Sequence, residues 1–199
     1  MMMDQSTELT TDELMHLALH AVGQKSPDKA ISFLKRLLLI EPENGKAHYL
    51  MGAVHAEIGM HAQAAEEMTR ALDLEPDLHT ARFQLGLLNL TSGKVDEAEQ
   101  VWTGLDILGD RDPLYLFKKG MLHLVKDEFE PCIKLLKAGI EVNTFNEDLN
   151  NDMRRVIMDA EKAMARQPTV DTEGADNPVT ADGRHILLSV YENKDGDDA

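Results

Sequence analysis

Cysteine is nearly absent from this sequence, with Cys132 the single example among 199 residues. One cysteine cannot form an internal disulfide, and a chain without such bridges fits a reducing compartment. Long apolar runs are missing too, since no stretch approaches the roughly 18 residues that a membrane-spanning helix needs. The first residues, Met-Met-Met-Asp-Gln-Ser-Thr-Glu, lack the basic start and the apolar run of a secretory signal peptide. We therefore expect a cytoplasmic protein that does not insert into a membrane.

Basic residues are also scarce, with 20 lysines and arginines against 36 acidic residues and a net charge of −16. Binding to nucleic-acid phosphates or to an anionic membrane surface needs clustered positive charge. The charge balance therefore disfavours both, and it leaves partners that are basic or are recognised by shape and apolar contact. Hydrophobic residues make up 43% of the chain, as in globular proteins, so the chain can bury a core.

Two similar tetrapeptides, Ile40-Glu41-Pro42-Glu43 and Leu74-Glu75-Pro76-Asp77, place prolines 34 residues apart. Treating each proline as position 32 of a 34-residue unit gives four units, 11–44, 45–78, 79–112 and 113–146, without insertion or deletion. Small residues at positions 8 and 20 allow two helices to approach closely, and a large residue at position 24 fills the space beside them. Position 8 holds Ala18, Gly52, Gly86 and Gly120, position 20 holds Ala30, Ala64, Ala98 and Cys132, and position 24 holds Leu34, Met68, Trp102 and Leu136.

This 34-residue pattern resembles the tetratricopeptide repeat family over residues 11–146. The resemblance implies an all-α fold, a right-handed superhelical solenoid of helix pairs with a concave and a convex side. Residues 147–166 repeat apolar side chains at helical spacing, and we expect one more helix there that caps the last pair. Unit 4 departs from the pattern at Lys119 (position 7), at Pro131 in its second helix and at Thr144 (position 32). Its geometry is therefore the least well specified of the four.

Both ends of the chain differ in composition from the repeats. Residues 1–10 precede the first unit, and we expect them to be disordered. Residues 167–199 hold eight acidic and two basic residues together with prolines and glycines, which predicts an acidic and largely disordered tail. Within the tail, Ile186-Leu187-Leu188-Ser189-Val190-Tyr191 forms an apolar segment rich in β-formers. Four alternatives remain open for this segment. It packs on the capping helix, enters the chain's own groove, pairs with a partner or a second copy, or stays disordered.

The resemblance implies that the first helix of each unit lines the concave groove through positions 2, 5, 9 and 12. Positions 5, 9 and 12 are apolar in all four units, which predicts a groove for an extended or helical protein segment with apolar anchors. The alternative is that the aromatic residues at position 5 only pack against the next repeat. The predicted protein-binding residues are Met15, Leu19, Tyr49, Phe83, Leu87, Leu90, Phe117, Met121 and Leu124.

The sequence contains no catalytic constellation, phosphate-binding glycine loop or complete set of metal ligands. His16 and His20 have the four-residue spacing of a helical zinc pair, but no third ligand follows in a recognised pattern. Cys132 fills the small position 20 and is interpreted as a core residue. We therefore predict that the chain is not an enzyme and binds no cofactor or metal.

Among the functions that the resemblance suggests, an adaptor or scaffold that binds a protein segment in the apolar groove is favoured. One alternative is a cytoplasmic chaperone similar to those of bacterial type III secretion, and another is an assembly factor that self-associates as a homodimer. Cochaperones of the family bind acidic chaperone tails through a clamp of lysine, asparagine and arginine. That clamp is excluded, because its positions hold Met15, Leu19, Leu50, Thr80 and Gln84.

Overall fold

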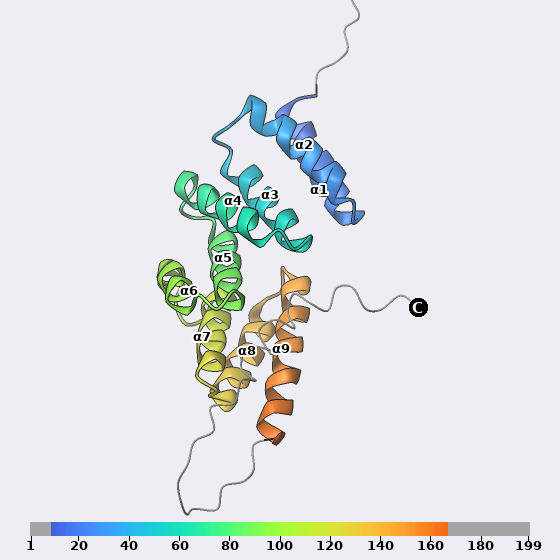
Figure 1. Ribbon diagram of the computed structural model, residues 1–199. Helices are drawn as coiled ribbons and strands as arrows, with labels where there is room; N and C mark the ends of the chain where they lie inside the picture. The colour runs from blue at the N-terminus through green and yellow to red at the C-terminus, as the bar shows by residue number, and fades with distance from the viewer. Residues whose placement is uncertain (1–8, 167–199) are drawn as a thin grey trace, which may run out of the picture. The chain divides into compact units, whose positions relative to one another are not determined.

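The structure, a computed structural model, describes residues 9–166, and within this range the chain forms helices and short connections but no strand. The predicted all-α class is confirmed (Figure 1). No helix in the described range has the length and apolar character needed to span a membrane. The tail with its segment 186–191 lies outside the described residues, as do residues 1–8. The helices are α1 (Thr11–Gly23), α2 (Pro27–Ile40), α3 (Gly45–Glu57), α4 (His61–Leu74), α5 (His79–Thr91), α6 (Val95–Trp102), η1 (Thr103–Leu108, a 3₁₀ helix), α7 (Pro113–Val125), α8 (Phe129–Val142) and α9 (Glu147–Arg166).

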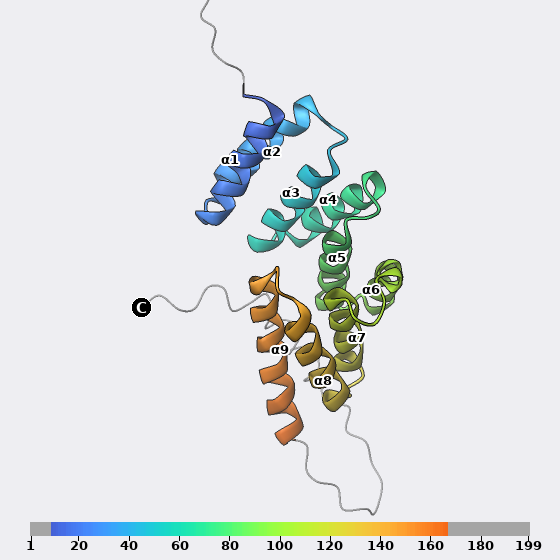
Figure 2. The same ribbon diagram turned by 180° about the vertical axis from the view of Figure 1, so that it is seen from behind.

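The described chain divides into two compact units, with the boundary between Leu88 and Asn89 inside α5. In the first unit α1 packs on α2 and α3 packs on α4, while α2 also contacts α3 (Figure 1). In the second unit α7 packs on α8 and α8 packs on α9, as Figure 2 shows from behind. Helices that pack in consecutive pairs are the arrangement of a helix-pair repeat.

The helices α1, α3, α5, α7 and α9 begin at 34-residue intervals, so α9 stands in the register of a first helix. Its position 8, however, is the exposed Arg154, where the earlier units have alanine or glycine. A long arginine side chain at this position leaves no room for a closely packed second helix. Arg154 therefore distinguishes α9 from the first helices of the four repeats.

Glycine at position 8 allows the first helix of a pair to approach the second closely. A Cβ on Gly52 would lie 2.8 Å from Cγ of Met68, and a Cβ on Gly120 would lie 2.6 Å from Cδ2 of Leu136. Both partners are buried residues at position 24. These distances are too short for two carbon atoms, so a larger residue at position 8 would push the helices apart. The close approach inferred from the sequence is present in both pairs.

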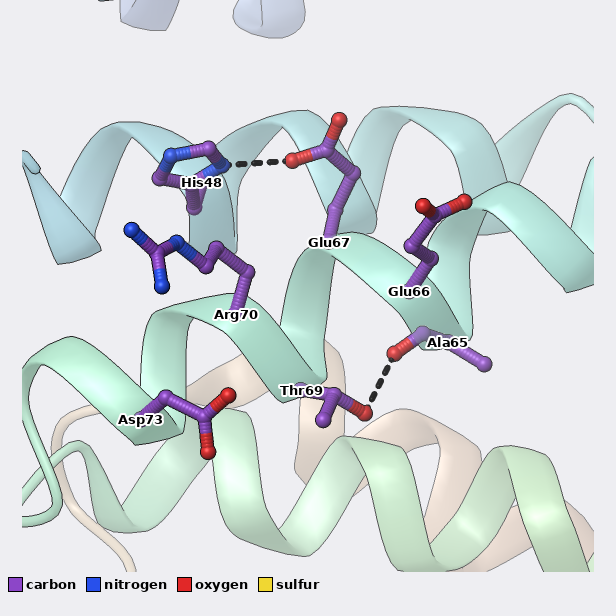
Figure 3. A pocket seen from close by; sticks show the side chains of 7 residues that line it. All are labelled: His48, Ala65, Glu66, Glu67, Thr69, Arg70 and Asp73. Carbon is purple, nitrogen blue, oxygen red and sulfur yellow. Dashed lines mark hydrogen bonds and ion pairs between the residues drawn. The ribbon is translucent and has the colours of Figure 1, made fainter. Parts of the chain in front are cut away.

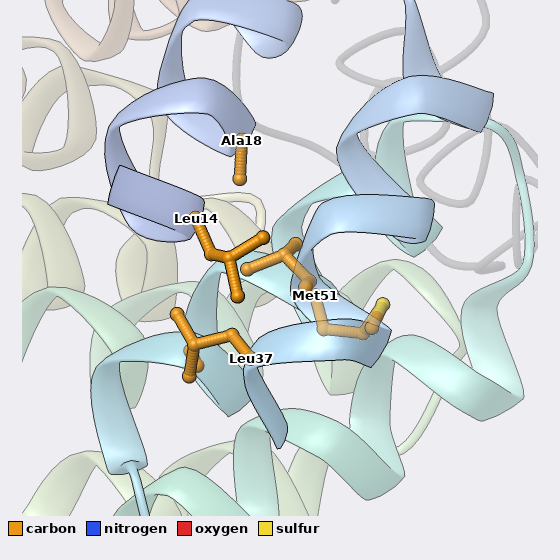
Figure 4. Close-up of a cluster of buried hydrophobic side chains, with 6 residues drawn as sticks. Leu14, Ala18, Leu37 and Met51 are labelled. Carbon is orange, nitrogen blue, oxygen red and sulfur yellow. The ribbon is translucent and has the colours of Figure 1, made fainter. Parts of the chain in front are cut away.

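The core of the first unit joins three helices in one apolar cluster. Helix α1 begins with a capping box. The Thr10 backbone N–H donates to the Glu13 carboxylate at 2.8 Å, and the Glu13 N–H donates to Thr10 Oγ1 at 3.2 Å. The first of these bonds is the main reason that the pKa of Glu13 is lowered. Figure 4 labels four members of the cluster, which consists of Leu14 and Ala18 from α1, Leu34 and Leu37 from α2, and Ala47 and Met51 from α3.

The irregular helix belongs to the third repeat of the sequence, whereas the fourth repeat is regular. Helix α6 has only eight residues and continues as η1 over six more. In the fourth repeat Lys119 is exposed and Pro131 lies in the first turn of α8, where a missing N–H breaks no helical hydrogen bond. The sequence departures of the fourth repeat therefore fall where a helix tolerates them.

A buried lysine accounts for the irregular segment. The side chain of Lys118 is 7% exposed, and its Nζ donates to the Trp102 carbonyl at 2.9 Å and to Asp106 Oδ1 at 2.6 Å. The Trp102 carbonyl is the one that a continuing α-helix would offer to the N–H of Asp106. The same ammonium lies 5.1 Å from the centroid of the Tyr115 ring. The lysine thus favours the tighter 3₁₀ path of η1.

Lys118→Ala is expected to lower the free energy of unfolding of the second unit by about 2 kcal/mol, because a buried carbonyl loses its charged donor. Trp102, the only tryptophan of the chain, reports this unfolding by its fluorescence in a urea titration. The neighbouring Lys119 is exposed and provides a matched control, with an expected change within about 0.5 kcal/mol for Lys119→Ala. Equal losses for the two variants would contradict this role of Lys118.

Candidate functional site

Three of the nine predicted protein-binding residues lie on the first unit with part of their side chains exposed. On α1, Leu14 and Ala18 are buried while the adjacent Met15 is half-buried and Leu19 is 50% exposed. Residues four apart lie on one face of a helix, so Met15 and Leu19 form a continuous apolar stripe beside the core. Met15 also packs against the core cluster formed by α1, α2 and α3. We call Met15, Leu19 and Tyr49 the apolar strip.

Tyr49, the third member of the apolar strip, is half-buried on α3. Burial removes water from its phenol and raises its pKa, so the side chain stays neutral over the physiological pH range. Helix α3 contributes to the same core cluster as α1, which places both helices in one packed body. A large and half-buried aromatic side chain of this kind is typical of a protein-binding anchor.

The other six predicted binding residues are buried, which corrects the expectation of a groove that is apolar and open from end to end. Phe83, Leu87 and Leu90 on α5 are between 0% and 4% exposed. Phe117, Met121 and Leu124 on α7 are equally covered, again between 0% and 4%. Side chains with so little exposed surface contribute to the interior of the fold.

The contacts of Phe117 show why it is not a groove residue. A Cβ on Gly139 of α8 would collide with the Phe117 ring, so the ring occupies the space above this glycine. Phe117 therefore points toward the second helix of its own pair. The sequence holds a signal for this contact, because glycine inside a helix costs about 1 kcal/mol relative to alanine and usually marks a close approach.

A depression of about 510 Å³ on the surface of the first unit is lined in part by His48, whose ring is hydrogen-bonded (Figure 3). The repeat pattern did not predict this interaction. His48 Nδ1 lies 2.6 Å from Glu67 Oε2 on α4, and His48 Nε2 lies 3.1 Å from the Pro42 carbonyl. One repeat later, Arg82 Nη2 donates to the Pro76 carbonyl at 2.9 Å. Position 4 therefore carries a donor for the carbonyl at position 32 of the preceding unit. These polar groups are engaged with each other and stabilise the connections between repeats.

No metal centre is formed among residues 9–166, because no three side chains of histidine, cysteine, aspartate or glutamate come together there. His16 and His20 are both exposed on α1. Cys132 is buried, and burial raises the pKa of its thiol to about 12. Since a reactive cysteine needs a thiolate and access, Cys132 has the properties of a core residue.

The family model of the tetratricopeptide repeat matches residues 45–78. DnaJ homolog subfamily C member 3 of Bos taurus is 37% identical over 59 residues, which is 30% of this chain and 12% of that protein. This chain therefore matches only a small part of that relative.

Two solved structures have a similar fold. A crystal structure of MamA aligns with a TM-score of 0.57 and 20% identity over 67% of this chain and 78% of that one. MamA 41-end from Desulfovibrio magneticus RS-1 aligns with a TM-score of 0.56 and 15% identity over 80% of this chain and 97% of that one. At these identities the likeness shows a shared fold.

Proposed function

We propose that this chain is a scaffold that binds a segment of another protein, a role supported by the match of residues 45–78 to the tetratricopeptide repeat and by the helix-pair fold. Repeats of this kind present extended surfaces that bind protein segments without catalysing a reaction. We propose that the apolar strip of Met15, Leu19 and Tyr49 is the binding surface. A cytoplasmic location and the absence of catalysis are part of the same proposal.

The exposure of Leu19 carries this proposal. Its side chain is 50% exposed, although Leu14 and Ala18 on the adjacent core face of α1 are completely covered. The exposed leucine and the half-buried methionine one turn before it, together with the half-buried Tyr49 on α3, give apolar area that water solvates poorly and that a partner can cover. The preferred ligand is an extended or helical segment that carries apolar anchors.

Leu19→Asp is expected to reduce capture of the partner by about tenfold or more, because a charge in a desolvated contact opposes binding. The measurement is quantitative mass spectrometry of proteins bound to the immobilised full chain, with each variant run beside the unchanged protein. Met158→Asp provides the control, since Met158 is a 55% exposed apolar residue on α9 and belongs to the other unit. Circular dichroism checks that both variants remain helical.

Loss of the same partners in both variants would mean that the added negative charge alone weakens binding, and retention of all partners by Leu19→Asp would reject the apolar strip as the binding surface.

The same experiment on a chain that ends at Arg166 tests the segment 186–191 as a competitor for the apolar strip. If that segment occupies the strip, its removal increases capture. Sedimentation of the purified chain tests self-association as a homodimer.

A further inference from the structure

A second surface of the first unit combines exposed apolar residues with negative charge. Leu39 and Ile40 are the last two residues of α2, and they are 84% and 59% exposed. The other exposed side chains on this outward face of α2 are polar, namely Asp28, Lys29, Ser32, Lys35 and Arg36. Two large adjacent apolar side chains at the end of a polar face form a local patch that gains free energy when a partner covers it.

An acidic depression follows directly after this apolar pair. Glu41, Pro42, Glu43 and Asn44 line it together with Glu75, and its volume is about 530 Å³. Glu75 is the C-cap residue of α4, so the depression brings the loop after α2 next to the end of α4 within one unit. We call Leu39, Ile40, Glu41, Glu43 and Glu75 the junction surface.

The carboxylates of the junction surface are held in place by neutral groups. Glu41 accepts hydrogen bonds from Asn44 Nδ2 at 2.8 Å and from Thr11 Oγ1 at 2.7 Å, and these bonds lower its pKa. The side chain of Glu75 lies over Gly45, where a Cβ would be 2.8 Å from Glu75 Oε1. Glu41 and Glu75 thus have defined positions before any partner binds.

The charges of the junction surface are also left without a cation. Within the part of the chain that the structure describes, neither Glu41 nor Glu43 nor Glu75 takes part in an ion pair. Three carboxylates that share one depression repel each other, and a cation brought by a partner relieves this repulsion. The surface therefore favours a ligand of positive charge.

We propose that the junction surface docks a basic segment of a partner protein, in which large apolar side chains lie between lysines or arginines. The apolar side chains cover Leu39 and Ile40, and the flanking cations reach the three carboxylates. Charge argues against the occupants that the chain itself could supply. A second copy of the chain has a net charge of −16 and is repelled, and the tail 167–199 is acidic as a whole, with eight acidic and two basic residues. These two basic residues, Arg184 and Lys194, flank the apolar segment 186–191, so the tail is the rival occupant that the test must exclude. A chain that ends at Arg166 is expected to bind a basic peptide with unchanged affinity, and tighter binding by that chain would overturn the proposal. This surface shares no residue with the apolar strip and differs from it in ligand chemistry.

The test uses the full chain and a short fluorescent peptide with a Leu-Leu pair flanked by lysines, titrated by fluorescence anisotropy. The triple variant Glu41→Gln, Glu43→Gln and Glu75→Gln is expected to weaken binding about tenfold, and Leu39→Ser with Ile40→Ser about fivefold. The triple variant Glu66→Gln, Glu97→Gln and Glu99→Gln removes the same charge from exposed positions on α4 and α6, and it should keep the original affinity.

Equal weakening by the two triple variants would overturn the proposal, because net charge alone would then explain the binding. An unchanged affinity of the Leu39→Ser and Ile40→Ser variant would overturn it as well. The Leu19→Asp variant distinguishes the two surfaces. If Leu19→Asp abolishes peptide binding while the junction variants bind normally, the peptide uses the apolar strip and the junction proposal fails. A peptide with glutamates in place of lysines is expected not to bind, and equal binding of that peptide would also contradict the proposal.

Discussion

Alanine at Phe117 is expected to lower the free energy of unfolding of the second unit by about 3–5 kcal/mol, the usual cost of removing a buried phenylalanine ring. The ring is 0% exposed and fills the space above Gly139 on α8. Its removal leaves a cavity between the two helices of this pair, because Gly139 has no side chain to fill the space. Urea unfolding followed by the fluorescence of Trp102, which lies in the same unit, measures the loss.

Alanine at Leu19 of the apolar strip provides the comparison that separates a structural role from a binding role. Leu19→Ala removes a side chain that is 50% exposed, so its expected cost is below about 1 kcal/mol. Because Leu19 lies in the first unit, this variant is followed by circular dichroism of the whole chain. A Phe117→Ala variant that is as stable as Leu19→Ala would contradict the burial of the ring and would restore Phe117 as a candidate for partner contact.

The thiol of Cys132 is expected to react with iodoacetamide at pH 8 roughly a thousandfold more slowly in the folded chain than in guanidinium chloride. Burial raises its pKa from 9.0 to about 12, a difference of three units, and each unit lowers the thiolate fraction tenfold. Only the thiolate attacks the reagent, so the rate follows this fraction. Equal rates in a chain that is folded by circular dichroism would contradict the burial of the thiol.

The same pKa shift makes stability depend on pH in a defined window. The unfolded thiol loses its proton near pH 9, whereas the folded thiol keeps its proton until about pH 12. The contribution of Cys132 is therefore constant below about pH 9 and decreases between about pH 9 and 12, by at most about 1.4 kcal/mol per pH unit. Tyr49 also has a raised pKa, so the comparison needs Cys132→Ala, which removes only the thiol. Alanine fits this position, since position 20 is Ala30, Ala64 and Ala98 in the other repeats.

The repeat pattern made much of the fold predictable. Glycine or alanine at position 8 and a large residue at position 24 are local requirements of a close helix pair, so they are visible in the sequence. The helix starts at Thr11, Gly45, His79 and Pro113 follow the same 34-residue spacing. Interruptions of a helix depend on distant groups instead. The change from α6 to η1 involves Lys118, whose burial cannot be read from a helix that also carries the exposed Lys119.

The candidate site was predictable only in part, for a related reason. Helical spacing shows which residues share a face, but it does not show whether a neighbouring element covers that face. Met15 and Phe117 hold the same position in their repeats, yet Met15 is half-buried and Phe117 is completely covered. Phe83 holds this position in the third repeat and is also completely covered, so the position in the repeat does not decide the exposure.

The all-α class, the period of 34 residues and the small positions that bring paired helices together follow from the amino-acid sequence, because these features rest on side-chain size at fixed local spacing. Which apolar residues remain accessible depends on tertiary packing. It covered six of the nine predicted contacts and left Leu19 exposed, and it placed Glu75 beside Glu41 and Glu43. Exposure and charge clustering depend on contacts between segments that are distant in the chain, and no local pattern contains them.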